Sequence, residues 1–242
     1  ALGLLHGSPR VHRMRSSTPR RLLRWCPLQS ARCADAALGG VDLFHHTSRV
    51  LPPIADAAET LAVSEIPPAG SPEERLLGQA LSRAEGALVF SQNSSKRLGS
   101  RFGFDPDRVH RVGVGCEHAR RVLGEPPPRE SIPRILAIGP LRKGRRPLRL
   151  LRAFELLSED GLMAHLHFVG GPGDDQQDFE RIVAASKVRL RIVRQRGLPE
   201  KDLAALLARS SVLVHLVEDA GTPVTPLEAF SLGTPVVASR LP

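Results

Sequence analysis

The stretch SVLVHLVEDAGTPVTPLEAFSLGTPVVAS, residues 211–239, alternates apolar runs with a helical pattern and indicates the fold class of the chain. The apolar run 211–217 predicts a buried strand, residues 225–233 predict a short helix, and the second apolar run, 234–239, predicts another strand. A strand, a helix and a further strand in this order are typical of two parallel strands joined by a crossover helix. The sequence therefore predicts a parallel sheet in this part of the chain.

The same alternation extends upstream in two series. The later series is the more regular, with strands predicted at 134–139, 164–171 and 188–193 and helices at 147–157, 174–186 and 199–210. The earlier series has strands predicted at 41–44, 60–63, 86–90 and 108–114, and helices within 71–85 and 93–103. We expect Ser71 to cap the first of these helices, Asn93 or Ser94 to cap the second, and Gly103 to end the second.

A Pro-rich stretch of mixed charge, ARRVLGEPPPRESIP at 119–133, separates the two series and has the composition of a linker. We therefore predict an α/β protein with two Rossmann-like domains facing a cleft. The predicted domains are residues 1–118, beginning with a basic arm at 1–34, and residues 134–242. Ligands of such sheets bind at the carboxyl ends of the strands, so functional residues are expected there.

The composition narrows the class of partner. The chain has 242 residues, 41% of them hydrophobic, and a formal net charge of +9. The positive charge favours anionic partners, namely nucleic acid, phospholipid headgroups or phosphorylated small molecules. Aromatic residues make up 4% of the chain and Tyr is absent, so the sequence lacks the stacking platforms of single-strand binders. We expect no nucleic-acid partner.

The basic arm contains no acidic residue from position 1 to position 34, whereas its arginines are Arg10, Arg13, Arg15, Arg20, Arg21, Arg24 and Arg32. One interpretation is a solvated arm. The other is a surface that attracts anionic lipid or an anionic acceptor, which would attach the protein to a membrane surface.

The cysteines and the apolar runs indicate the compartment. No run of 18 apolar residues predicts a membrane-spanning helix, and the first segment lacks the continuous apolar core of a secretory signal. Cys26, Cys33 and Cys116 do not have zinc-site spacing, so we interpret them as free thiols in a reducing compartment. The expected location is cytoplasmic, with peripheral attachment to the inner membrane face as an open alternative.

Two strand-to-helix turns of the later series are candidate anion sites. In AIGPLRKGRR, 137–146, a glycine ends the strand and four basic side chains follow, which can neutralise phosphates: Arg142, Lys143, Arg145 and Arg146. The alternative is a solvent-exposed basic turn. The Gly-rich turn FVGGPGDD, 168–175, can also cradle phosphate, but two adjacent glycines are weak evidence and a tight turn is the favoured interpretation.

Glu228 lies in the first turn of the predicted helix 225–233, where a glutamate usually compensates the helix dipole. Because this helix begins where a ligand is expected, Glu228 is also a candidate acceptor of hydrogen bonds from the vicinal hydroxyls of a sugar. In FHHTS, 44–48, two adjacent histidines point to opposite sides of an extended chain and are poor joint metal ligands. We interpret these histidines as structural, with one lining the cleft as the alternative.

With these motifs together, the sequence resembles the family 4 (group 1) retaining glycosyltransferases of the GT-B fold. The resemblance covers about residues 41–241 and is strongest from 134 onward. It rests on the order and spacing of DLFHHTSRVLPP, GALVFSQNSSKRLGSRFGFDPDRVHRVGVG, ILAIGPL, HFVGG, RGLPEKDLAALLARSSVLVHLV and TPLEAFSLGTPVVAS. Because the family has further elements at both ends, the resemblance implies a fragment whose first domain is incomplete at its N-terminus and whose second is truncated at its C-terminus.

The resemblance implies transfer of a sugar from a nucleoside diphosphate to an acceptor hydroxyl, with retention and without an obligatory metal or other cofactor. Glu228 matches the family's second Glu, which binds the donor ribose, and Arg145 matches its phosphate-binding Lys. Arg145 and Lys143 are then expected to stabilise the leaving diphosphate. Gly197 and Leu198 match the stretch that flanks the base. The expected donor-binding residues are Gly139, Arg142, Gly197, Leu198, Glu218, Asp219, Thr225 and Glu228.

The first domain is implied to hold the acceptor, with His45 and Thr47 in the acceptor cleft. A lipid-linked acceptor and a polysaccharide both remain open. No metal ligands are expected.

The sequence departs from the family pattern at several positions, and two of these departures, Pro140 and Ala220, favour as the alternative a non-catalytic homologue that binds a nucleotide or a partner. The family's Arg after the strand glycine is Pro140 here, its first Glu is Ala220, and Ser64-Glu65 replaces a common His-Asp pair. A dinucleotide-dependent oxidoreductase is disfavoured because no GxGxxG follows a first strand with an acid about 20 residues further on.

Overall fold

The computed structural model describes residues 33, 35, 40–47, 54–128, 131–218 and 221–240, which divide into two compact units. Unit 1 comprises Ala1–Arg111 and unit 2 comprises Val112–Pro242. The basic arm predicted at 1–34 lies outside the described residues, except for position 33. No helix in the described ranges combines the length and the apolar character needed to span a lipid bilayer.

Unit 1 contains a parallel sheet in the order β1-β2-β3-β4, formed by Leu43–His46, Ala58–Val63, Gly86–Val89 and Val109–Arg111. Its helices are α3 (Pro72–Leu81), α4 (Gln92–Phe102) and the 3-10 turn η1 (Pro106–Arg108). A buried cluster that includes Leu61, Val63, Val89 and Leu98 packs these elements together. Each strand pairs with its successor in sequence because the intervening segments are long enough to return the chain to the same edge of the sheet.

Helix α3 begins as predicted, with Ser71 accepting a hydrogen bond from the Glu74 backbone N–H at 3.1 Å. The expectation for α4 was wrong, because neither Asn93 nor Ser94 is its N-cap. Ser91 has extended dihedrals and its Oγ accepts from the Ser94 N–H at 3.1 Å, so the helix begins directly after β3. Gly103 ends α4 in the left-handed conformation, as predicted.

Unit 2 contains a five-stranded parallel sheet in the order β7-β6-β5-β8-β9. These strands are Ile192–Gln195, His165–Val169, Arg134–Ile138, Val212–His215 and Val236–Ala238. The helices are α5 (Glu117–Leu123), α6 (Pro147–Glu159), α7 (Gln176–Ala185), α8 (Glu200–Arg209) and α9 (Val224–Ser231), with 3-10 turns η2 (Lys143–Arg145) and η3 (Arg189–Arg191). Both sheets are parallel, which confirms the predicted α/β class.

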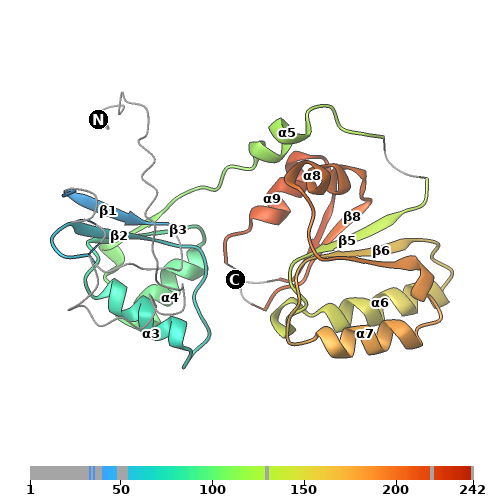
Figure 1. Ribbon diagram of the computed structural model, residues 1–242, viewed down its shortest axis with the longest axis horizontal. Helices are drawn as coiled ribbons and strands as arrows, with labels where there is room; N and C mark the ends of the chain where they lie inside the picture. The colour runs from blue at the N-terminus through green and yellow to red at the C-terminus, as the bar shows by residue number, and fades with distance from the viewer. Residues whose placement is uncertain are drawn as a thin grey trace. The chain divides into compact units, whose positions relative to one another are not determined.

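The sheet of unit 2 is covered on both faces. Helices α6 and α7 lie on one face, with Phe154 and Phe179 buried against Phe168 of β6 (Figure 1). Helices α8 and α9 lie on the other face, with Leu207 and Ala229 packed in one apolar cluster. Since β6 and β7 extend the sheet on one side of β5, and β8 and β9 on the other, the strand order reverses between β5 and β8. Such a switch point is where ligands of open parallel sheets bind.

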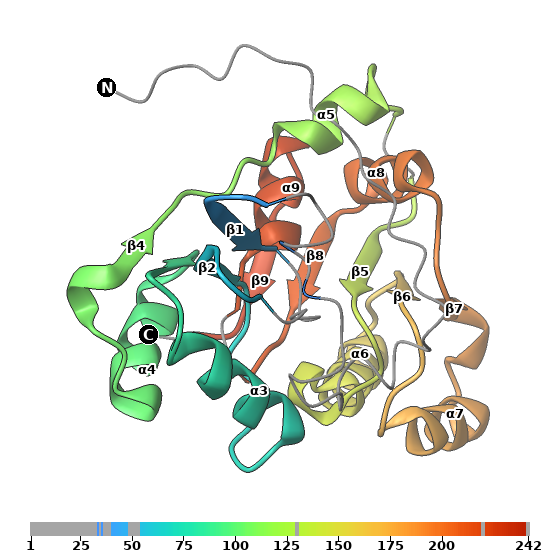
Figure 2. The same cartoon turned by 60° about the vertical axis from the view of Figure 1, so that its left-hand side comes forward.

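Two segments differ from the sequence-based expectation. The strand predicted at 188–193 begins only at Ile192, because Arg189–Arg191 form η3, in which the Arg191 N–H bonds to the Val188 carbonyl at 2.9 Å. The stretch predicted as a linker overlaps helix α5, which packs along α8 and α9 (Figures 1 and 2). Ala119 and Leu123 of α5 are buried, so this part of the stretch belongs to the core of unit 2.

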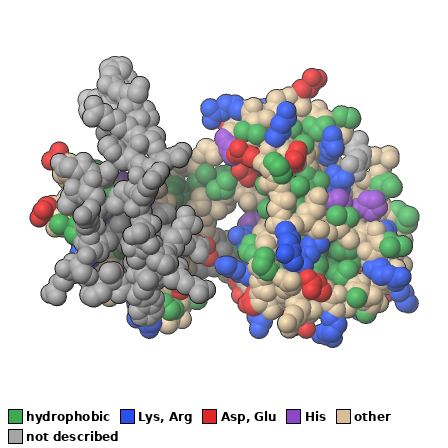
Figure 3. Space-filling model, viewed as in Figure 1, with side chains coloured by type: hydrophobic (Ala, Val, Ile, Leu, Met, Phe, Trp, Pro, Cys, Tyr) green, Lys and Arg blue, Asp and Glu red, His purple; other side chains and the backbone are tan. Residues whose placement is uncertain are grey.

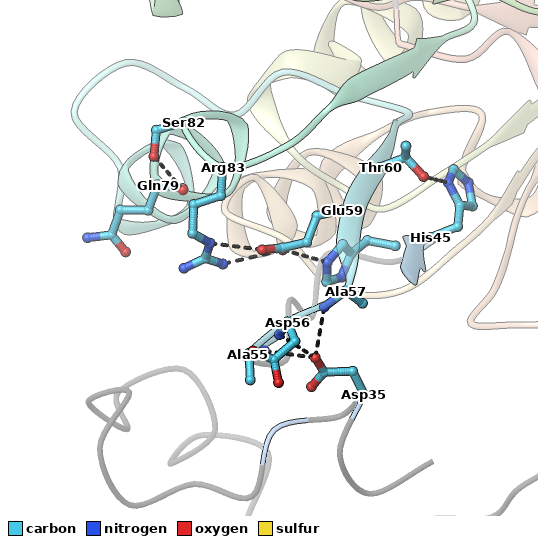
Figure 4. Close-up of polar contacts among 11 residues, drawn as sticks. Asp35, His45, Ala55, Asp56, Ala57, Glu59, Thr60, Gln79, Ser82 and Arg83 are labelled. Carbon is cyan, nitrogen blue, oxygen red and sulfur yellow. Dashed lines mark hydrogen bonds and ion pairs between the residues drawn. The ribbon is translucent and has the colours of Figure 1, made fainter. Parts of the chain in front are cut away.

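A polar network ties β1 and β2 together in unit 1. The Glu59 carboxylate accepts from Arg83 Nε at 2.9 Å and lies 3.0 Å from His46 Nε2, and both Glu59 and His46 are buried (Figure 4). Asp35 Oδ2 accepts from three successive backbone N–H groups, those of residues 55–57, at 2.7–3.1 Å. These bonds anchor the chain just before β2.

We expect unit 1 to lose stability in mild acid because of His46. Burial lowers the pKa of His46, although its hydrogen bond to Glu59 acts in the opposite direction. The folded state therefore binds fewer protons than the unfolded state, so stability is intact above about pH 6.5 and falls as the pH drops below it. Hydrogen-exchange protection factors of the β1 and β2 amides should fall between pH 7 and 5.5. His46→Gln should flatten this dependence, whereas His45→Gln, at an exposed site, should leave it unchanged.

Candidate functional site

The switch point between β5 and β8 contains a small cavity. It is bounded by the end of β5, the turn that follows it, the start of α6, Phe168 of β6 and the end of β8. Its volume is about 20 Å³, enough for about one water molecule, so it forms the floor of a site rather than a substrate pocket. Among the residues that line the cavity, Arg145 and His215 carry the ionisable side chains.

The basic turn after β5 uses much of its own backbone internally. The N–H groups of Arg142, Arg145 and Arg146 bond to the carbonyls of Pro140, Arg142 and Lys143 at 2.8–2.9 Å, and the Lys143 N–H bonds to Asp174 Oδ1 at 3.0 Å. The side chains of Arg142, Lys143 and Arg145 are exposed. An anion at this turn would therefore be held mainly by cationic side chains. This agrees with the interpretation of the turn as a site whose basic side chains neutralise phosphates.

The Gly-rich turn 168–175 has a structural role. The Gly139 N–H bonds to the Val169 carbonyl at 2.9 Å and the Leu141 N–H bonds to the Gly171 carbonyl at 3.2 Å, so the turns after β5 and β6 pack backbone to backbone. A Cβ atom on Gly170 would overlap the Gly139 carbonyl, and one on Gly173 would overlap the Leu141 carbonyl. The tight-turn interpretation of this stretch is confirmed. The turn holds the backbone of Gly139 and Leu141, which line the cavity, in place.

Arg145 and His215 lie together at this floor. The Arg145 side chain covers Gly139, with Nε 3.5 Å from the position that a Gly139 Cβ would occupy. Burial, followed by the positive charge of Arg145, lowers the pKa of His215 to about 4, so the imidazole is neutral at physiological pH. His215 was missed by the sequence analysis. The available signal was an ionisable residue at the end of an otherwise apolar strand at the switch point.

Glu218 also joins the basic turn. Its backbone N–H bonds to the Gly144 carbonyl at 3.0 Å, and its Oε1 accepts from Arg146 Nε at 3.4 Å. The structure thus brings Glu218 to the basic turn, which also carries the predicted residues Arg142, Lys143 and Arg145. Asp219 and Ala220 lie outside the described residues.

Glu228 does not lie in the first turn of its helix, which corrects the sequence-based expectation. Helix α9 begins at Val224, so Glu228 is its fifth residue, and the first turn contains no acidic side chain. Burial raises the pKa of Glu228, His118 of α5 acts to lower it, and Glu200 of α8 acts to raise it. Glu228 is thus half-buried and faces α5 and α8 rather than compensating the helix dipole.

The other predicted residues are more dispersed. Thr225 lies in the first turn of α9, and Gly197 is exposed in the loop between β7 and α8. Leu198 packs against the apolar cluster under α8 and α9. In unit 1, His45 is exposed, with Nδ1 2.8 Å from Thr60 Oγ1, and Thr47 is exposed at the end of β1.

Charge on the visible face of unit 2 is mixed. Lys and Arg side chains are spread over this face and interspersed with Asp and Glu, so they form no continuous basic stripe there (Figure 3). Within the described ranges, no group of three or more His, Cys, Asp or Glu side chains is arranged to hold a metal ion.

Comparison of the chain with known proteins identifies a family model that matches part of its sequence. Residues 132–242 match the family model of the group 1 glycosyl transferases. No curated protein sequence matches the chain.

Three of the solved structures with a similar fold illustrate the likeness. Sucrose-phosphate synthase from Thermosynechococcus elongatus is 16% identical, with a TM-score of 0.65 over 84% of this chain and 57% of that one. HepE from Anabaena, solved with UDP-glucose, is 15% identical, with a TM-score of 0.60 over 81% and 59%. TarM from S. aureus, solved with UDP, is 13% identical, with a TM-score of 0.60 over 76% and 37%.

The chain therefore spans between about a third and six-tenths of the length of these proteins. Their likeness shows the fold, in which each of the two units has a parallel sheet as in the GT-B fold. The chain thus has the GT-B fold, and residues 132–242, slightly less than half of it, match the model of the group 1 glycosyl transferases.

Proposed function

We propose that this protein is a family 4 glycosyltransferase that moves a sugar from a nucleoside diphosphate to an acceptor hydroxyl, with retention. The observation that carries the proposal is the basic turn at the switch point, where Arg142, Lys143 and Arg145 follow the end of β5 within the residues that match the group 1 model. A diphosphate is an anion that the guanidinium and ammonium groups of this turn can bind through charge-assisted hydrogen bonds, and ligands of parallel sheets bind at this edge.

The chemistry assigned to this turn is stabilisation of the leaving diphosphate. Charge builds up on the phosphate oxygens as the bond to the sugar breaks, and fixed cations lower the free energy of that state. Arg145 supplies a guanidinium at the end of β5, and Lys143 supplies an ammonium group on the same turn. His215, which lines the same cavity as Arg145, is neutral at physiological pH because its pKa is lowered to about 4. It therefore adds no charge to the site. No obligatory metal is needed in this proposal.

Glu228 is proposed to bind the ribose of the donor, with Thr225 nearby and Gly197 and Leu198 beside the base. An ionised carboxylate is an acceptor for two hydroxyl groups at once, which suits a vicinal diol. The relatives solved with UDP or UDP-glucose support a nucleoside diphosphate sugar as the donor class. For the acceptor, we propose a lipid-linked or polysaccharide hydroxyl held by unit 1, with His45 and Thr47 at that site. We further propose a cytoplasmic protein with peripheral membrane attachment.

Calorimetric titration with UDP, GDP and ADP tests the donor site. We expect the wild-type protein to bind at least one of them, and Glu228→Ala to weaken that binding about tenfold or more, because hydrogen bonds to a charged group contribute about 1.5–3 kcal/mol. Glu159→Ala, at the exposed end of α6, is the matched control and should bind like the wild type. Equal affinities of the Glu228 variant and the wild type would remove Glu228 from the site. Failure of the wild-type protein to bind any of the three would overturn the donor proposal.

A second candidate function is a non-catalytic homologue that binds the nucleotide without transfer. Pro140 favours it, because this position lacks both the guanidinium of the family's Arg and a backbone N–H. The two candidates differ in turnover. The enzyme releases a nucleoside diphosphate from the donor, whereas the homologue binds the donor and leaves it intact.

A further inference from the structure

Three helices of unit 2 each contribute one ionisable side chain to a common junction. His118 lies near the start of α5, Glu200 is the first residue of α8, and Glu228 lies in the middle of α9. We call these three residues the junction cluster. Helix α5 packs against both α8 and α9 through an apolar seam formed by Leu123, Ala204, Ala208 and the partly buried Ala205 and Leu232.

The spacing of residues along the helices places the cluster at one end of this seam. Residues four apart lie on the same face of a helix. Glu200 therefore shares a face with Ala204 and Ala208 on α8, and Glu228 of α9 lies on the same side as Leu232, which caps the end of that helix. Each glutamate is one turn before an apolar residue of the seam. Both carboxyl groups thus point toward the same end of the junction.

His118 completes this end of the junction from α5. It lies one residue before the buried Ala119, and its Nε2 forms an ion pair with Glu200 Oε1. The imidazole therefore joins α5 to the start of α8. Its charge also acts on Glu228 of α9, the residue proposed to bind the donor ribose.

His118 and Glu200 shift the pKa of Glu228 in opposite directions. Burial is the largest cause of the raised pKa of Glu228, the charge of His118 lowers that pKa, and the charge of Glu200 raises it. The other elements packed against α9 are β8 and β9, whose titratable side chain is His215. The pKa of His215 is lowered to about 4, so His215 is mostly uncharged over the pH range in which the cluster is tested.

We propose that His118 and Glu200 are positioning residues that set the charge of the Glu228 carboxyl group and, through it, the affinity of the site for a nucleoside diphosphate sugar. This inference rests on the proposed function. An ionised carboxylate is the stronger acceptor for the ribose hydroxyls, whereas protonation converts one oxygen into a donor. His118 keeps Glu228 ionised as the pH falls, and Glu200 opposes this effect. Helix α5 is the first helix of unit 2. Through His118 it raises the affinity of the donor site at acidic pH.

The test combines two measurements on the full chain. Carboxyl-carbon NMR of Glu228, assigned with the Glu228→Gln variant, reports its ionisation without any ligand. Calorimetry with UDP-glucose reports affinity, and the two phosphates of this probe carry no group that titrates near neutral pH. Both are measured from pH 4.5 to 8 in His118→Gln, Glu200→Gln and the double variant. Glu117→Gln, an exposed acid on the same helix, is the matched control.

We expect the two single variants to shift the Glu228 titration, and the affinity for UDP-glucose, in opposite directions. His118→Gln should move the Glu228 titration to higher pH and weaken UDP-glucose binding about two- to fivefold on the acidic side of its midpoint, because partly exposed charge pairs contribute modestly. Glu200→Gln should move the titration to lower pH and strengthen acidic binding by a similar factor. The double variant should return close to the wild type, which a general loss of folding would not produce. All variants should bind equally at pH 8.

The outcomes separate this inference from the proposed function. A Glu228 titration that stays unchanged in both single variants, or that moves in the same direction in both, overturns the role of His118 and Glu200. If the titration moves as expected but wild-type protein does not bind UDP-glucose or any other nucleoside diphosphate, the proposed function is overturned, and the link to donor affinity with it. Opposite shifts in both titration and affinity support the inference.

Discussion

Replacement of Gly170 by alanine is expected to lower the free energy of unfolding of unit 2 by about 3 kcal/mol or more. The new Cβ atom would overlap the carbonyl oxygen and carbon of Gly139, and both belong to the backbone rather than to a side chain that can rotate away. The turns after β5 and β6 would have to separate, which breaks the hydrogen bonds that join Gly139 to Val169 and Leu141 to Gly171. Urea unfolding followed by circular dichroism measures the loss.

The adjacent glycine supplies a matched control for this prediction. A Cβ atom on Gly171 has no atom within 4 Å, so Gly171→Ala should change the free energy of unfolding by no more than about 0.5 kcal/mol. If the two variants are equally stable, the close packing of the two turns is not a property of the protein in solution. A folded Gly170→Ala variant should also bind a nucleoside diphosphate more weakly, because the turn that carries Arg145 is displaced with Gly139.

Arg145→Ala is expected to lower the rate of nucleoside diphosphate release from the donor about 100- to 1000-fold, the loss typical when one fixed group that stabilises a developing charge is removed. The guanidinium lies over Gly139 at the switch point, where the proposed diphosphate leaves. Arg145→Lys should recover part of the rate, because it restores the charge but not the planar pair of donors. The measurement is turnover of the donor that binds best in calorimetry.

Arg149→Ala is the control for this second prediction, since Arg149 is an exposed arginine in the first turn of α6 and does not line the cavity. It should turn over the donor at the wild-type rate. An Arg145→Ala rate equal to that of the control excludes Arg145 as the group that stabilises the diphosphate. Donor binding without turnover in the wild-type protein favours the non-catalytic homologue, for which Pro140 is the sequence signal.

Much of the fold could be predicted from the sequence because its signals are local. The apolar runs and helical periodicities identified β5, β6, β8, α6 and α8 nearly to their observed ends. Ser71 and Gly103 acted at the helix ends as predicted, because a cap satisfies backbone groups within three or four residues of itself. The basic turn was also found from sequence alone, since a glycine followed by four cations within seven residues needs no tertiary contact to be noticed.

Other features depended on contacts between distant residues. Ser91, rather than Asn93 or Ser94, is the N-cap of α4 because β3 ends just before it. Strand β7 begins at Ile192 because that residue pairs with Leu166 of β6. Gly170 is required by the Gly139 backbone 31 positions away, and not by its own turn.

The order of the strands and helices along the chain, the parallel sheets and the position of the basic turn thus follow from local sequence signals. Which ionisable groups meet depends on how the chain packs in three dimensions. His215 lies beside Arg145 because β8 and β5 are neighbours in the sheet, although 70 positions separate the two residues. Glu228 lies near His118 and Glu200 because α5, α8 and α9 pack along one apolar seam. The physical reason is that burial and charge act through space, whereas propensity and capping act along the chain.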